Sequence, residues 1–288
     1  MSFSGGFHGR TLGALACTHS KAIHKVDVPS FDWPVADYPI YKYPLEENKS
    51  YNKKEDDRCL AKIKSLIKDF SKHTPVAGCI LEPIQGEGGD NPGSAYFFQN
   101  LRKITTEKGI ALIIDEVQTG CGPTGDFWAH EHFNLPSPPD IVTFSKKMLI
   151  GGYFYLAPFR PDQPYRIFNT WLGDPSKLVL LNAAIKIIKQ ENLLQNIKTS
   201  GAKLKNGLEE AQKRYPGKIM NARGRGTYIG LDFETHALRD KAIDELHLHG
   251  VHCGGSGDRT LRFRTTLTFN EKHVDQFLDR FEKTMKTL

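Results

Sequence analysis

The chain has 288 residues, of which 39% are hydrophobic and 25% are charged. This balance is typical of a globular protein with enough apolar surface to bury a sizeable core. The net charge is +6, but the lysines are scattered along helical-looking stretches, as at Lys62, Lys64 and Lys68, and form no block. Because nucleic-acid binding proteins concentrate their positive charge, we expect no nucleic-acid partner.

The cysteines and the apolar runs indicate in which kind of compartment the protein is expected. The cysteines lack the paired short spacings of a zinc or disulfide framework, so a reducing compartment is the default. They are Cys17, Cys59, Cys79, Cys121 and Cys253. No apolar run approaches the roughly 20 residues of a membrane span, and the first ten residues lack an apolar signal core. We expect a soluble protein with no membrane partner.

The first half of the chain predicts helices that alternate with buried strands. Apolar residues recur at helical spacing over 56–71, and a continuous apolar run follows at 76–81. A second helix at 95–108 leads into the run 110–114, and a third run covers 141–144. Such alternation predicts an α/β fold with a mainly parallel, doubly wound sheet.

The second half has a different character. Asp174 and Pro175 combine an N-cap residue with proline at the first helical position, which predicts a long helix connecting two domains. Short strands at 227–233 and 260–264 then alternate with helices, which is typical of an α+β lobe. We expect residues 1–190 to form a large domain with the start of the connecting helix, and residues 191–288 to form the rest of that helix and a small domain.

Polar residues follow three of the predicted strands. Glu82, Asp115 and Lys146 each come directly or almost directly after an apolar run. Ligands of parallel sheets gather beyond the carboxyl ends of the strands. One carboxylate there often only caps a helix or turn, and Lys146 with Lys147 could be a solvated pair. Two carboxylates and an amine that converge are more typical of a cofactor site.

Pyridoxal phosphate matches two of these groups. The cofactor needs an amine that forms a Schiff base with it and a carboxylate that keeps its ring nitrogen protonated. Lys146 and Asp115 meet these two needs. Spacing alone leaves the solvated lysine pair open as the alternative.

Several longer motifs carry a family resemblance. The segments 115–120 (DEVQTG) and 121–125 (CGPTG), with Ser145 and Lys146 at the expected distance, resemble the signature of the class III aminotransferases. Further matching segments are FHGR at 7–10, EPIQGEGGD at 82–90, FWAHEH at 127–132, FNTW at 168–171 and LRFR at 261–264. Together they are similar to the 4-aminobutyrate aminotransferase subgroup, from Phe3 nearly to the C-terminus.

This resemblance implies a fold-type I pyridoxal-phosphate transferase, with a partial large domain and a C-terminal α+β small domain. It implies transamination of 4-aminobutyrate with 2-oxoglutarate, giving succinate semialdehyde and glutamate. Another omega-amino acid, such as beta-alanine or ornithine, is the alternative donor. The partners would be small amino and keto acids.

The resemblance also assigns roles around the cofactor. Lys146 would be the Schiff-base lysine and proton carrier, and Lys147 a bystander. Asp115 would pair with the ring nitrogen. Phe7 would stack on one face of the ring and Val117 would pack on the other.

Three more residues would complete this pocket. Gln118 would reach the phenolic oxygen of the ring, and Glu82 would frame the pocket. Thr170 would touch the cofactor phosphate of a partner subunit, which implies a homodimer with shared active sites.

Substrate recognition needs two carboxylate grips at different distances from the amine. A guanidinium group binds a carboxylate through two parallel hydrogen bonds. Arg10 is the candidate for the distant carboxylate and Arg262 for the one beside the amine. With a substrate that lacks the second carboxylate, Glu87 would pair with Arg262. Without the resemblance, we would interpret Arg262 as an ordinary strand arginine and Glu87 as a loop carboxylate.

The resemblance begins in the middle of the family's large domain. The Gly/Ser-rich turn that holds the phosphate at a helix N-terminus is expected ahead of Phe7. A non-catalytic remnant that only associates with full-length subunits is therefore a rival interpretation. The family suggests the mitochondrial matrix, with the targeting segment outside this chain, and otherwise the cytoplasm.

Metal binding is not expected from this chain. The animal enzymes of the family resemble iron-sulphur proteins, but their cluster cysteines would precede residue 1, so Cys17 and Cys121 are not expected to be ligands. The histidine pairs at 130 and 132 and at 247 and 249 match no zinc-site spacing. Pyridoxal phosphate is the one cofactor that the sequence supports.

Overall fold

The computed structural model describes residues 1–171 and 173–288. The helices are α1 Leu12–Ala16, α2 Lys49–Phe70, α3 Ala95–Lys108, α4 Pro175–Gln190, α5 Leu193–Arg214, α6 His236–Leu248 and α7 Glu271–Thr287. The strands are β1 Ser2–Phe3, β2 Val35–Ala36, β3 Gly78–Leu81, β4 Ile84–Gln85, β5 Asn91–Pro92, β6 Ala111–Asp115, β7 Ile141–Phe144, β8 Gly152–Tyr155, β9 Ile219–Arg225, β10 Tyr228–Phe233, β11 Gly254–Ser256 and β12 Thr260–Arg264.

The first half of the chain builds a four-stranded sheet in the order β3-β6-β7-β8. The first three strands are parallel, and β8 joins the edge antiparallel to β7. The core beside this sheet includes Phe97 and Leu101 of α3 and Leu112 and Ile114 of β6. The carboxyl ends of the three parallel strands therefore meet at one edge of the sheet.

Local sequence determines where these helices begin and end. The Ser94 hydroxyl accepts a hydrogen bond from Phe97 N (2.9 Å) at the start of α3, and Gly109 ends the helix at φ 64°. The predicted bounds of α3 and β7 agree with the structure. Helix α2 begins at Lys49, earlier than the predicted start at residue 56. The apolar spacing could not predict these first turns, because their residues are almost entirely polar.

The C-terminal lobe is an α+β layer built on an antiparallel sheet in the order β11-β12-β10-β9. Helices α5, α6 and α7 pack with it around a second core that includes Leu204, Leu208, Ile229 and Phe281. Strand β9 was not predicted, because its polar sequence shows no alternation of apolar residues.

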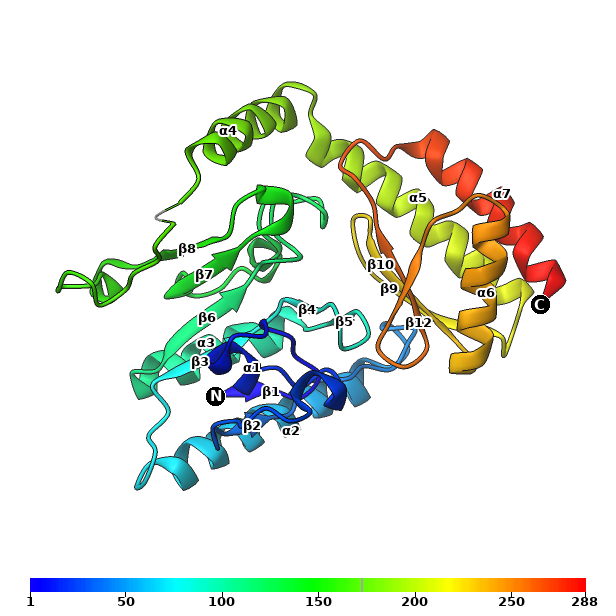
Figure 1. Cartoon of the computed structure of the whole chain (residues 1–288). Helices are drawn as coiled ribbons and strands as arrows, with labels where there is room; N and C mark the ends of the chain where they lie inside the picture. Colours follow the sequence, from blue (N-terminus) through cyan, green and yellow to red (C-terminus); the bar gives the residue numbers. More distant parts are fainter. Residues whose placement is uncertain (172) are drawn as a thin grey trace.

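Helices α4 and α5 run from the sheet to the C-terminal lobe (Figure 1). The predicted N-cap is confirmed: Asp174 Oδ1 accepts from Lys177 N at 3.3 Å, and Pro175 is the first helical residue. The predicted long helix is divided in two, since Asn192 adopts a left-handed conformation (φ 51°) between α4 and α5. Within the described ranges no helix is long and apolar enough for a membrane span.

Candidate active site

The three strand-end residues singled out by the sequence lie on neighbouring strands. Glu82 follows β3, Asp115 ends β6 and Lys146 follows β7, and these strands are paired in the order β3-β6-β7. The parallel pairing brings the three positions to the same edge of the sheet. Burial, hydrogen bonds and charge then distinguish their chemistry.

Asp115 is buried and its carboxylate is held on both oxygens. Oδ1 accepts hydrogen bonds from Val117 N and from the Thr143 hydroxyl, both at 3.0 Å. Oδ2 lies 2.8 Å from His8 Nδ1. An ionised carboxylate can only accept, so Nδ1 of His8 carries the proton in this bond. These contacts orient the Asp115 carboxylate before any ligand binds.

His8 was not predicted as a site residue, although it stands in the quoted motif between Phe7 and Arg10. Its side chain is 1% exposed. Within the described part of the chain, its Nε2 atom has no hydrogen-bond partner. Its place in the FHGR motif was the signal that could have pointed to His8. Its hydrogen-bond partner, Asp115, lies 107 positions away, so no sequence pattern indicated the contact.

Glu82 is buried and connects the end of β3 to the N-terminal segment. Its carboxylate accepts from Phe7 N and Gly86 N, both at 3.0 Å. The pKa of Glu82 is raised to about 7, mainly by burial. The Asp115 charge adds to this shift, while His8 and the two amide donors oppose it. Glu82 thus holds the backbone of Phe7 beside the strand ends.

Lys146 begins a short 3₁₀ helix, Lys146–Met148, in a left-handed conformation (φ 50°). The residue is exposed to solvent, but the protein around its amino group still desolvates it and lowers its pKa. Glu87 and Glu82 oppose this shift, whereas Arg264 and Arg262 add to it. The charges of two of the three predicted site carboxylates, Glu87 and Glu82, therefore act on the Lys146 amine.

Lys147 has different surroundings. Burial lowers its pKa too, but the charges that affect it are those of Arg264 and Cys121. None of the predicted site carboxylates contributes to its shift. Of the two adjacent lysines, Lys146 is the one whose pKa is affected by Glu87 and Glu82.

Arg262 and Glu87, which are far apart in the sequence, form an ion pair. Arg262 extends from β12 and donates from Nη1 to Glu87 Oε1 at 2.7 Å. Burial alone would raise the pKa of Glu87, but the hydrogen bond and charge of Arg262 lower it. Both side chains are partly exposed, at 31% and 25%, so a ligand has access to the pair.

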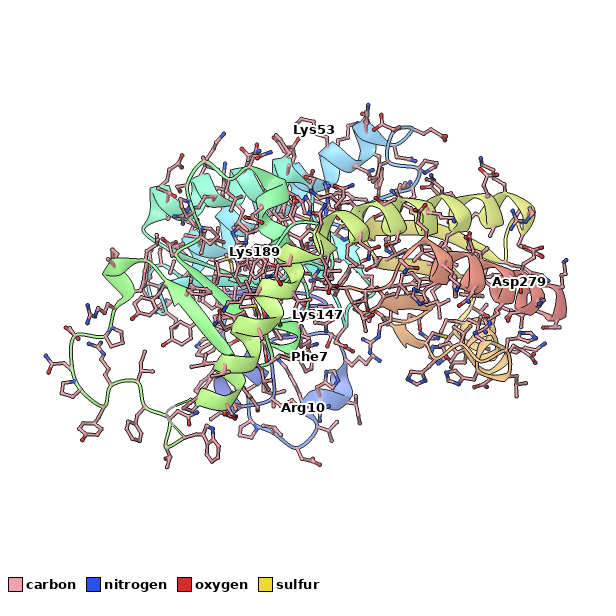
Figure 2. All side chains as sticks on the ribbon, turned by 90° about the horizontal axis from the view of Figure 1, so that it is seen from above. Phe7, Arg10, Lys53, Lys147, Lys189 and Asp279 are labelled. Carbon is pink, nitrogen blue, oxygen red and sulfur yellow. The ribbon has the colours of Figure 1, made fainter. Side chains whose placement is uncertain are left out.

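Phe7 and Arg10 lie on the N-terminal segment of the chain. The Phe7 ring meets the His24 ring edge-on, with centroids 5.2 Å apart. Arg10 is exposed, and its charge affects the pKa of His24, as does that of Glu87. In Figure 2, Phe7, Arg10 and Lys147 lie in the same part of the view, whereas Asp279 of α7 lies at the far end.

Thr170 was predicted to contact the cofactor phosphate of a partner subunit. It is exposed on the segment that joins β8 to α4. In Figure 1 part of this segment extends away from the sheet.

Gln118 contacts two residues, Tyr228 and Arg264, for which the sequence predicted no role. Its Oε1 atom lies 3.1 Å from the Tyr228 hydroxyl and 3.3 Å from Arg264 Nε. Arg264 also forms an ion pair with Asp90. Arg264 and Asp90 stood in the quoted motifs, but no sequence signal connected them with Gln118.

Comparison with known proteins now identifies the family. The aminotransferase class-III family model matches residues 1–285. The chain belongs to the class III aminotransferases. The predicted family is confirmed, and so is the fold class.

The most similar relatives agree with the predicted subgroup. The 4-aminobutyrate aminotransferase of Dictyostelium discoideum is 54% identical over 288 residues, which cover all of this chain and 58% of that protein. The mitochondrial 4-aminobutyrate aminotransferase of Homo sapiens is 54% identical over 282 residues, covering 98% of this chain and 56% of its own length. The chain thus spans little more than half of these relatives.

Among solved structures, the lysine aminotransferase of M. tuberculosis in its internal aldimine form superposes with a TM-score of 0.93 at 30% identity. The match covers 99% of this chain and 66% of that one. Class III aminotransferases depend on pyridoxal phosphate. The described residues fit the ring side of this cofactor, because they combine an amine of lowered pKa at Lys146 with an oriented carboxylate at Asp115.

Proposed function

We propose that this chain carries the catalytic centre of an enzyme that transfers an amino group from 4-aminobutyrate to 2-oxoglutarate, giving succinate semialdehyde and glutamate. The observation that supports the proposal is the placement of Glu82, Asp115 and Lys146 at the same edge of the paired strands β3-β6-β7, with the Asp115 carboxylate held in one orientation. Relatives at 54% identity that are named 4-aminobutyrate aminotransferase support the choice of substrate.

The chain's own residues would divide the work around Lys146. Pyridoxal phosphate, when bound, supplies a carbonyl group that takes the amino group and a ring that accepts electrons. Lys146 would hold the cofactor and move the proton at the amine-bearing carbon of the substrate. Its lowered pKa increases the fraction of free amine, the form that accepts a proton.

Asp115 would hold a proton on the ring nitrogen. Its bonds to His8, Val117 N and Thr143 keep the carboxylate oriented, so no reorganisation is needed. Phe7 and Val117 would pack on the two faces of the ring, and Gln118 would donate to its phenolic oxygen. Glu82 would frame the pocket by holding Phe7 N.

The Arg262–Glu87 pair suits an enzyme with two kinds of substrate. With 4-aminobutyrate, which has no carboxylate beside its amine, Glu87 neutralises Arg262 and avoids an unpaired charge. With 2-oxoglutarate or glutamate, the substrate carboxylate would replace Glu87 on Arg262. Arg10, exposed near Glu87 and His24, would bind the distant carboxylate in both cases.

We also propose that two copies share their active sites, with Thr170 contacting the cofactor phosphate of the partner. Exposed aromatic and aliphatic side chains surround Thr170, including Ile167 (61%), Phe168 (58%) and Trp171 (74%). An apolar surface of this kind is typical of an interface. Sedimentation velocity measurements should show a dimer.

The names of the relatives also bear on the cellular compartment of the protein. Mammalian relatives are named mitochondrial, and we propose the mitochondrial matrix for the protein that contains this chain. Fractionation of cells that express it from its own gene would test this location.

Donor spectra test the proposed reaction. Cofactor-treated protein should lose its long-wavelength absorbance on mixing with 4-aminobutyrate, and 2-oxoglutarate should restore it while glutamate appears. Ornithine and beta-alanine serve as competing donors. A spectrum that responds to ornithine but not to 4-aminobutyrate would overturn the donor, and a chain that never binds the cofactor would support the remnant interpretation.

A further inference from the structure

Arg264 has the surroundings of a positioning residue. It lies two positions after Arg262 on β12, so both side chains project from the same face of that strand. Its guanidinium carbon is 3.5 Å from the centre of the Tyr228 ring, a cation–π contact. Burial alone would lower the pKa of Arg264, but Tyr228 and Asp90 raise it. Arg264 is therefore a fixed positive charge.

The partner of Arg264 is itself held rigidly. Asp90 is buried and adopts a left-handed backbone conformation (φ 55°). Arg223 donates a hydrogen bond to its carbonyl oxygen at 3.1 Å. Gly230 leaves room for it, because a Cβ there would lie 2.8 Å from Asp90 Cβ. Asp90 thus keeps the guanidinium group of Arg264 in one position beside Gln118.

The contacts of Gln118 determine the orientation of its carboxamide. An arginine Nε can only donate, so the Gln118 atom that faces Arg264 Nε must be the carbonyl oxygen. The Tyr228 hydroxyl lies 3.1 Å from the same oxygen and can donate to it as well. Both donors occupy the oxygen, and the NH₂ group is left on the other side of the amide.

A glycine preserves the space for this arrangement. A Cβ at Gly86 would come within 2.6 Å of Gln118 Oε1 and 2.8 Å of the Tyr228 hydroxyl. A larger residue at position 86 would therefore displace the Gln118–Tyr228 contact. The backbone of Gly86 is fixed in turn, since its carbonyl accepts from the Ser256 hydroxyl.

We propose that Arg264, together with Tyr228, is a positioning residue that holds the oxygen of the Gln118 carboxamide and so leaves its NH₂ group to donate to the phenolic oxygen of the cofactor. The inference rests on the proposed function and deepens it. The phenolic oxygen of pyridoxal phosphate is an acceptor, so only the NH₂ end of Gln118 stabilises it. A reversed amide would present its oxygen and repel it.

A double-mutant cycle on cofactor affinity tests this inference. We expect Arg264→Lys to raise the Kd for pyridoxal phosphate roughly tenfold, because the charge remains but the Nε donor is lost. Tyr228→Phe, which removes one hydroxyl and keeps the ring, should raise the Kd about threefold. Arg259→Lys, just before β12, is the matched control and should leave the Kd unchanged.

The cycle is completed in a Gln118→Met background. If Arg264 acts through Gln118, Arg264→Lys should cause no further loss of affinity there. A full additional tenfold loss, or an unchanged Kd for both Arg264→Lys and Tyr228→Phe in the wild-type background, would overturn the inference. Should Arg264→Lys fail to fold, the Tyr228→Phe and Gln118→Met pair decides the question in the same way.

Failure of the proposed function is distinguishable from failure of this inference. Urea unfolding of the cofactor-free variants should show non-additive midpoint shifts for Arg264→Lys and Gln118→Met, because the contact exists without ligand. If the wild-type chain binds no cofactor but these shifts are non-additive, the proposed function fails and the contact stands. Additive shifts would remove the contact on which the inference depends.

Discussion

Two regions of the chain differ in how their side chains are accommodated. The 86–90 loop is held against the C-terminal sheet by buried polar contacts. Arg223, which is 5% exposed, donates to Gly89 O, to Asp90 O and to Asp232. The segment from β8 to α4 instead exposes large apolar side chains, such as Tyr153 (41%) and Trp171 (74%).

The first region is fixed by contacts within this chain, whereas the second presents apolar side chains to solvent. Glu87 of the 86–90 loop and Arg264 beside it are positioned by contacts inside this chain. Thr170 lies on the exposed segment, where an apolar surface remains to be covered. We therefore expect substitutions in the two regions to differ in kind, with stability effects in the first and association effects in the second.

The largest effect is expected for Arg223→Ala. The substitution removes the charged partner of Asp232, to which Asn221 and Thr260 still donate, and leaves the carbonyls of Gly89 and Asp90 without the Arg223 donor. Loss of this buried ion pair should cost about 3–5 kcal/mol of the free energy of unfolding. Urea unfolding measures this loss. Arg214→Ala is the control, because its pair with Glu282 is exposed and contributes about 1 kcal/mol or less. Equal losses in both variants would remove the distinction between buried and exposed contacts.

Asp115→Asn should affect chemistry more than folding. The neutral amide cannot hold a proton on the ring nitrogen, so the absorbance change with 4-aminobutyrate should slow by roughly 10²- to 10³-fold. Stopped-flow spectroscopy gives this rate. Asp279→Asn on the exposed face of α7 serves as the matched control. An unchanged rate in Asp115→Asn would contradict the assigned role of Asp115.

Glu82 should make stability depend on pH. Its folded pKa of about 7 exceeds the ordinary value of 4.5, so the folded state retains a proton that the unfolded state releases between these values. Stability should therefore fall as the pH rises from about 4.5 to about 7, by up to about 3 kcal/mol from this group. Urea unfolding across this window should give a flatter profile for Glu82→Gln. A slope identical to wild type would disprove the assignment.

The smallest effect is expected in the exposed segment. Ile167→Ser removes an apolar side chain that is 61% exposed, so the free energy of unfolding should change by no more than about 0.5 kcal/mol. The same substitution should weaken dimer formation in sedimentation experiments. A large loss of stability in the monomer would show that this segment is packed within the chain, and the contrast between the two regions would disappear.

Apolar periodicity predicted the regular elements where one face is buried. Helix α3 and strands β7 and β12 lie within their predicted bounds. The early start of α2 and the whole of β9 could not be predicted, because their residues are mostly polar and tertiary pairing stabilises them.

The site was predictable to a similar degree. Strand-end positions predicted Glu82, Asp115 and Lys146, which the structure brings to one edge of the sheet, and the family motifs added Arg262 and Glu87, which it pairs. The supporting contacts could not be predicted, because they join residues far apart in the chain. Asp115 meets His8 across 107 positions, and Arg264 meets Gln118 across 146.

Borohydride reduction of the cofactor-treated protein, followed by peptide mapping, tests the central claim most directly. Reduction makes the bond between the cofactor and its lysine permanent, and tandem mass spectrometry assigns the modified residue. Lys146→Ala is the control that should lose the label. We predict a pyridoxyl group on Lys146 and none on the adjacent Lys147; a label on Lys147, or no label on any lysine, would contradict the account.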